Sequence, residues 1–207
     1  MLAGWVKEKP DPSLKNRACQ AALDIEKAVD QFNRSQSSDE DRLPTRIGLH
    51  SGELLLGAIG AMDHYEYGPL GDIVNTVQRI ERLNKQLHTR ILVSKDVIDQ
   101  LDGFLTRELG RFLLKGKIES NSIYELVCRK EESNDQQRIK CMTFAEVLGP
   151  FRKGYWKEAE EAIEKFQESI KSFGEDGPSL FFSDLCKKYI RKPPREPWDG
   201  VVPMEEK

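Results

Sequence analysis

Residues 71–79 read Gly-Asp-Ile-Val-Asn-Thr-Val-Gln-Arg, a glycine followed by an amphipathic segment. The apolar positions recur at the spacing that places one stripe of a helix against a core, and they are Ile73, Val77, Ile80 and Leu83. We expect the helix to begin with Asp72 as its N-cap and to run to about Leu83. Asn75 and Arg79, four residues apart, share a different face of this helix.

Strand-like and helical segments alternate on both sides of this helix. Upstream, the pattern predicts a helix over 14–32, strands over 45–50 and 54–59 joined as a hairpin through Ser51-Gly52, and an extended stretch over 61–69. Downstream, it predicts a strand over 90–93, a short helix capped by Ser94, and a hairpin of residues 106–114 and 123–128. Such alternation indicates an α/β (α+β) fold, a sheet with helices packed on it.

The chain changes character after Cys128. Residues 129–143 are strongly polar and predict a linker, and helical patterns follow over 144–151, 156–173 and 178–190. The Pro-rich, acidic end, 191–207, predicts an extended or docked tail. We therefore expect a domain over 1–128, a polar linker over 129–143 and a helical tail over 144–207.

Composition narrows the class of partner. A formal net charge of -3 gives no basic footprint for nucleic acid, and no apolar run approaches the roughly 20 residues that span a bilayer. The 4 cysteines are scattered without a C-x-x-C pair, which favours reduced thiols over a disulfide framework or a zinc site. The 3 histidines lack metal-ligand spacing and are interpreted as surface or structural residues. We expect a soluble, cytoplasmic chain.

Four blocks, in order, resemble the class III adenylate and guanylate cyclase catalytic domain. They are RIGLHSGE at 46–53, GAIG at 57–60, the 71–79 segment, and LKGK at 114–117. The resemblance covers about residues 1–128, and the ordered set is specific although each block alone is weak. It implies a ferredoxin-like cyclase sandwich, incomplete at its N-terminal end, with added C-terminal helices. The tail resembles those behind some bacterial receptor-type cyclases, whose parent proteins often carry membrane sensors.

The resemblance also implies roles for individual residues. Asn75 would orient the ribose, Arg79 would stabilise the phosphoryl transition state, and Lys115 would approach the triphosphate. Gly71 and Asp72 complete the expected substrate-binding set. Cyclisation moves negative charge onto oxygens around the α-phosphorus, so positioned donors suit the reaction. Taken singly, each of these residues also fits an ordinary surface position.

Cyclases of this family use Mg or Mn held by two aspartates, and the resemblance offers no counterpart of either in this sequence. We therefore expect no metal ligands within the chain and no activity from the chain alone. A complementing cyclase half or a homodimer is the expected partner. A natural truncation, a misassigned start codon and a deliberately shortened protein explain the sequence equally well.

Two functions remain open at this point. In the first, the chain is part of an adenylate cyclase that converts ATP to cyclic AMP and pyrophosphate. In the second, it is a degenerate cyclase-like domain that serves as a dimerisation and interaction module. Retention of Asn75, Arg79 and Lys115 favours the enzyme. Gly68, at the position that helps select the base, has no side chain, so ATP is favoured over GTP by family frequency alone.

Overall fold

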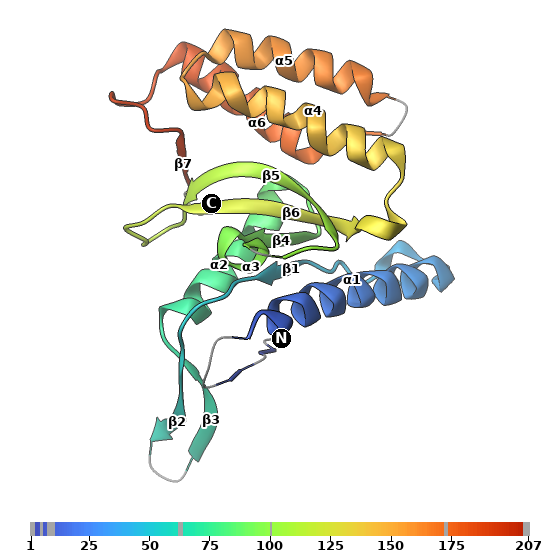
Figure 1. The fold of residues 1–207 in the computed structure, drawn as a ribbon, viewed down its shortest axis with the longest axis vertical. Coiled ribbons are helices and arrows are strands. Elements are labelled where there is room, and N and C mark those ends of the chain that lie inside the picture. Colours follow the sequence, from blue (N-terminus) through green and yellow to red (C-terminus); the bar gives the residue numbers. More distant parts are fainter. Residues whose placement is uncertain are drawn as a thin grey trace.

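The computed structural model describes residues 3–4, 6–7, 11–61, 64–99, 101–171 and 174–204, and a five-stranded mixed sheet lies at their centre (Figure 1). The strands are β1 (Ile47–Leu49), β4 (Ile91–Ser94), β5 (Phe104–Leu113), β6 (Asn121–Arg129) and β7 (Val201–Pro203). Their order across the sheet is β1-β4-β6-β5-β7. β1 is parallel to β4 and β7 is parallel to β5, whereas β6 is antiparallel to both of its neighbours. The predicted α+β architecture is confirmed.

Helix α2 (Asp72–Leu87) lies between β1 and β4 in the chain. The two strands pair in parallel, with Ile47 opposite Ile91 and Leu49 opposite Val93. Parallel strands cannot be joined by a tight turn, so a crossover helix is required between them. The helix runs four residues beyond the predicted end at Leu83, because Leu87 is also fully buried.

The predicted hairpin between residues 45–50 and 54–59 is wrong. β2 (Leu55–Ala61) pairs instead with β3 (His64–Leu70), and the two strands form an arm that projects from the body (Figure 1). Gly52 permits a turn but does not require an antiparallel return. The burial available beside β4, whose four residues are all buried, outweighs that local signal.

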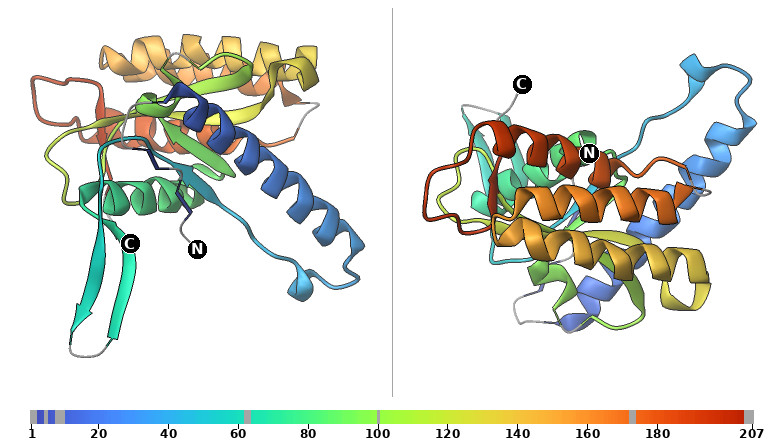
Figure 2. Two further views of the ribbon diagram at one scale, coloured as in Figure 1. Left: turned by 60° about the horizontal axis from the view of Figure 1, so that its bottom comes forward. Right: turned by 90° about the horizontal axis from the view of Figure 1, so that it is seen from above.

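Helices cover both faces of the sheet. α1 (Pro12–Ser35) and the short α3 (Lys95–Ile98) pack on one face, where Ile91 and Val93 join their core. Leu92, which points the opposite way, joins the core formed with α2, α4 (Asp135–Arg152), α5 (Trp156–Ser169) and α6 (Gly177–Arg191). Figure 2 shows α4, α5 and α6 side by side on that face. None of the described helices is long and apolar enough to cross a membrane.

The segment predicted as a polar linker, 129–143, is largely helical. After the 3₁₀ turn η2 (Lys130–Glu132), α4 begins with a capping box in which Asn134 Oδ1 accepts from Gln137 N at 2.8 Å. Gln137 Oε1 in turn accepts from Asn134 N at 3.0 Å. The polar composition therefore marks a helix cap and an exposed first turn rather than a linker. The tail helices share one apolar core with the sheet. The division of the chain into a domain and a tail therefore stays a prediction.

Gly48 in β1 sets the distance between the sheet and α2. A Cβ atom on this glycine would lie 2.6 Å from Glu81 N and 2.8 Å from Val77 O, both backbone atoms of the helix. We expect Gly48→Ala to push α2 outward and to lower the free energy of unfolding by about 1–3 kcal/mol, as overpacking does. Urea denaturation measures this. Gly149→Ala is the control, because a Cβ there meets nothing within 4 Å, and equal midpoints for the two variants would contradict the close packing.

Candidate functional site

The N-terminal turn of α2 and the turn between β5 and β6 meet at one site. Gly71, with φ 126°, leads into the helix, and Asp72 is its first residue rather than the predicted N-cap. Lys117 Nζ forms an ion pair with the Asp72 carboxylate and hydrogen-bonds to the Asp72 carbonyl oxygen at 3.4 Å. The hydrogen bond from Lys117 holds the pKa of Asp72 below its usual range. The turn is thereby tied to the start of the helix.

Arg79 lies against the same turn. A Cβ on Gly116, which has φ 67°, would lie 3.3 Å from Arg79 Nη2, so the guanidinium rests on the glycine. Arg79 Nη1 is buried and has no hydrogen-bond partner. A buried donor left without an acceptor costs about 1–3 kcal/mol, which an anionic oxygen placed beside it would recover. The site thus presents an orphaned cationic donor.

The other sequence-predicted residues lie close by in different settings. Asn75 is exposed, one helical turn before Arg79 and on the same side of α2. Lys115 is exposed on the β5–β6 turn, whereas the side chain of Lys117 is only 11% exposed. Sequence reasoning chose Lys115 and missed Lys117, although the block LKGK contains both. The assigned catalytic and substrate-binding roles remain predictions.

His50, just after β1, borders the site. Its Nδ1 lies 2.8 Å from Ser94 Oγ and 3.7 Å from Asp96 Oδ2. Burial lowers the pKa of His50, an effect that the Asp96 charge opposes and the Lys117 charge reinforces. The ring is therefore neutral at pH 7, in accord with its interpretation as a structural residue. Arg79, Lys115 and Lys117 bring positive charge to the site, and the Asp72 and Asp96 carboxylates bring negative charge, a balance that suits a polyphosphate.

Ligands for the Mg or Mn that the resemblance implies are not clustered among the described side chains. No group of three or more His, Cys, Asp or Glu side chains in the part of the chain that the structure describes could hold a metal ion. The described site offers a substrate the amide of Asn75 and the cationic groups of Arg79, Lys115 and Lys117.

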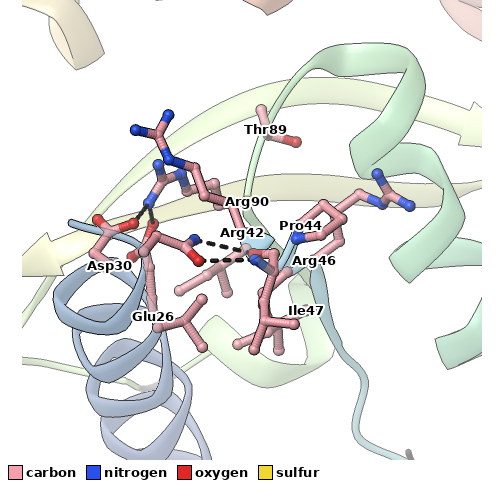
Figure 3. A pocket seen from close by; sticks show the side chains of 13 residues that line it. Glu26, Asp30, Arg42, Pro44, Arg46, Ile47, Thr89 and Arg90 are labelled. Carbon is pink, nitrogen blue, oxygen red and sulfur yellow. Dashed lines mark hydrogen bonds and ion pairs between the residues drawn. The ribbon is translucent and has the colours of Figure 1, made fainter. Parts of the chain in front are cut away.

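A pocket of about 450 Å³ lies elsewhere, between α1, residues 42–47 and the start of β4 (Figure 3). Its charged side chains are neutralised locally, because Arg90 pairs with Asp30 and, at 3.5 Å, with Glu26. Arg46 likewise lies 3.4 Å from Glu81. The pocket lies at the beginning of β1 and β4. The candidate site at the N-terminal turn of α2, called the α2 site from here on, lies near the ends of these strands, so the pocket is separate from it.

Comparison with known proteins identifies relatives of this chain. The sequence profile of the adenylate and guanylate cyclase catalytic domain matches residues 2–128. Adenylate cyclase 1 of Rhizobium meliloti is 33% identical over 129 residues, which are 61% of this chain and 19% of that protein. Retinal guanylyl cyclase 1 of Bos taurus is 39% identical over 113 residues, 53% of this chain and 10% of that protein. The chain thus spans a fifth or less of these relatives.

A solved structure of a bacterial light-regulated adenylyl cyclase has a similar fold. The TM-score is 0.50 at 23% identity, with 62% of this chain and 38% of that chain covered. At this identity the likeness concerns the fold alone. It agrees with the mixed sheet and its helices described above.

Proposed function

This chain belongs to the adenylate and guanylate cyclase catalytic domain family, and on that basis we propose that its α2 site binds the ribose and triphosphate of ATP. It would act as the nucleotide-contacting part of an adenylate cyclase that forms cyclic AMP and pyrophosphate. The observation that carries the proposal is Arg79, whose guanidinium is seated on Gly116 with a buried, unpartnered Nη1. A polyphosphate oxygen is the acceptor that this donor lacks.

The proposed mechanism rests on positioning and charge. As the ribose 3′-oxygen attacks the α-phosphorus and pyrophosphate leaves, negative charge grows on the surrounding oxygens, and Arg79 donates to them with a planar guanidinium. Asn75, one helical turn earlier, offers an exposed amide to the ribose. Lys115 and Lys117, on the turn, face the triphosphate charge. Because Asn75 and Arg79 lie on one helix, its backbone fixes the spacing between the amide and the guanidinium group.

We further propose that the chain alone makes no cyclic nucleotide. In the complete family domain, bound Mg or Mn would supply charge stabilisation for the displacement at the α-phosphorus. By the resemblance, the aspartates that hold these ions have no counterpart among residues 1–207, so another segment or chain would supply them. This proposal makes the chain one side of a shared active site.

Nucleotide binding by the purified chain tests the proposed function. We expect calorimetric titration to show that a non-hydrolysable ATP analogue binds, and that Arg79→Met weakens the binding. The control is Gln78→Ala, at an exposed neighbouring position on α2. A parallel titration with a GTP analogue decides the base preference. Gly68, at the position that helps select the base, and its pairing partner Gly57 in β2 have no side chains with which to contact a base. Folded protein that binds neither analogue would contradict the proposal.

Gly116 offers a second test of the same site. Gly116→Ala places a methyl group 3.3 Å from Arg79 Nη2 and should weaken binding of the ATP analogue roughly 10-fold, a cost of about 1.4 kcal/mol. Gly103→Ala is the matched control, because its φ of 93° brings similar backbone strain but a Cβ there meets nothing within 4 Å. Equal loss of affinity in both variants would mean that Arg79 is not held by the turn.

A second candidate function is an interaction module. The projecting arm exposes Leu55 at 73% and its pairing partner in β3, Leu70, at 39%. Exposed apolar residues gathered in this way are typical of protein contacts. Sedimentation velocity, read together with the nucleotide titration, separates the two candidates. Self-association without nucleotide binding favours the interaction module, whereas nucleotide binding favours the enzyme.

A further inference from the structure

We propose that β7, at the C-terminal end of the chain, positions the β5–β6 turn of the nucleotide site. The turn is the part of the site that carries Lys115, Gly116 and Lys117, and it would be held in place by a strand about ninety residues further along the chain. This inference rests on the proposed function for its effect on nucleotide affinity, but its structural claim stands on backbone pairing alone.

β6 and β7 pair with opposite edges of β5, and just before the turn the pairing with β7 extends one residue further than the pairing with β6. β6 pairs with β5 as far as Phe112, opposite Asn121. One residue later, Leu113 lies opposite Pro203 of β7, and its carbonyl oxygen accepts from Met204 N at 3.0 Å. The tail therefore supplies the last interstrand contact of β5 at the residue that leads into the turn.

The turn itself is small and transmits its position directly to α2. Lys117 N donates to Leu114 O at 3.0 Å and closes it. Gly116 then supports the Arg79 guanidinium, and Lys117 pairs with Asp72. Only the residues between Leu113 and Lys117 separate β7 from both of these contacts, so a shift of Leu113 would move the support of Arg79.

β7 is anchored by the helical core rather than by the site. Trp198 Nε1 donates to Phe151 O at 3.2 Å, and the indole packs edge-on against Trp156, with ring centroids 5.0 Å apart. Val202 is buried, and Arg111 Nη1 donates to Asp199 O at 3.3 Å. The tail helices thus hold a strap whose far end reaches the nucleotide site, and Trp198 and Val202 are positioning residues.

Hydrogen exchange on the full chain tests the strap. Met204→Pro removes the one N–H that donates to Leu113, without introducing charge into the core. We expect amide exchange over residues 113–117 to quicken about 5-fold, the effect of one backbone hydrogen bond, while exchange in β4 is unchanged. Val202→Asp, which detaches β7 more completely, should quicken it further. Arg195→Ala, exposed on the same tail, is the control and should change nothing.

Titration of the same variants with the ATP analogue links the strap to the site. The expected result is an affinity about 5-fold weaker for Met204→Pro and unchanged for Arg195→Ala, consistent with a lost hydrogen bond. Unchanged exchange over 113–117 in protein whose β7 amides exchange freely would overturn the inference. So would faster exchange there with unaltered affinity. If the unsubstituted chain binds no analogue, the proposed function fails, and the exchange result alone decides whether the strap exists.

Discussion

Arg79→Ala is expected to lower cyclic nucleotide formation by about 10²–10³-fold when the chain is assayed with a separately produced metal-binding half of a cyclase, the loss typical of a removed transition-state donor. The protein should remain folded. Arg79 Nη1 is buried without a partner, so the substitution removes an unsatisfied donor and leaves the apolar stripe of α2 intact. Initial rates and the thermal midpoint of the same preparation measure both effects.

Arg79→Lys separates charge from geometry. Lysine retains the positive charge but not the planar pair of donors, so we expect an intermediate rate. Gln78→Ala, at an exposed position of the same helix, serves as the control and should be as active as the parent. Full activity of Arg79→Ala would remove this residue from the mechanism.

The second large effect concerns stability. Arg107 in β5 is 1% exposed, and its Nη1 lies 2.8 Å from Asp176 Oδ1, at the N-cap of α6. Its Nη2 lies 2.6 Å from Glu125 Oε2 without hydrogen-bond geometry, so that contact is an ion pair. Asp176 also pairs with Lys140 Nζ at 2.7 Å and accepts from Ser179 N at 3.0 Å. These contacts join the sheet to two of the tail helices.

Asp176→Ala should therefore lower the free energy of unfolding by about 3–5 kcal/mol, because it leaves the buried Arg107 guanidinium without one of its counterions. Urea denaturation measures the loss. Asp184→Ala, in α6 but away from this ion-pair network, is the control. A loss below about 1 kcal/mol for Asp176→Ala would mean that the buried pair contributes no more than a surface ion pair.

The same network predicts a pH dependence. Burial alone would raise the pKa of Asp176, but the charges of Arg107 and Lys140 outweigh it and hold this pKa below its usual range. A carboxyl group whose pKa is lowered in the folded state stabilises the protein above its unfolded pKa, near 4, and loses that contribution as the pH falls. The stability difference between the parent and Asp176→Asn should shrink below about pH 4. A difference that stays constant from pH 6 to pH 3 would contradict the network.

Local patterns in the sequence predicted the helices and most strands, because apolar periodicity is a local property. α1, α2 and α6 lie where their apolar stripes indicated. The strand pairing was not predictable in this way. That β1 pairs with β4 depends on Gly48 lying against α2, a contact between residues about thirty positions apart that no turn signal encodes.

The candidate site was predicted in part. The block at 71–79 indicated the helix that carries Asn75 and Arg79, and LKGK indicated the turn. The Lys117–Asp72 ion pair was missed because it joins segments 45 residues apart. The end of the chain was predicted only as an extended or docked tail, and its pairing as β7 was missed because three strand residues inside a Pro-rich segment show no alternation; only the open edge of β5 makes them a strand.

A cyclase assay with manganese, with ATP and GTP in separate reactions, tests whether this chain is one side of a shared active site. Purified chain is assayed alone and then mixed with a metal-binding half. We predict no product from the chain alone and cyclic AMP from the mixture, since the chain would supply Asn75 and Arg79 to a shared site. Cyclic nucleotide made by the chain alone would contradict this division of the active site. A silent mixture, from folded halves that associate, would contradict the enzymatic role itself.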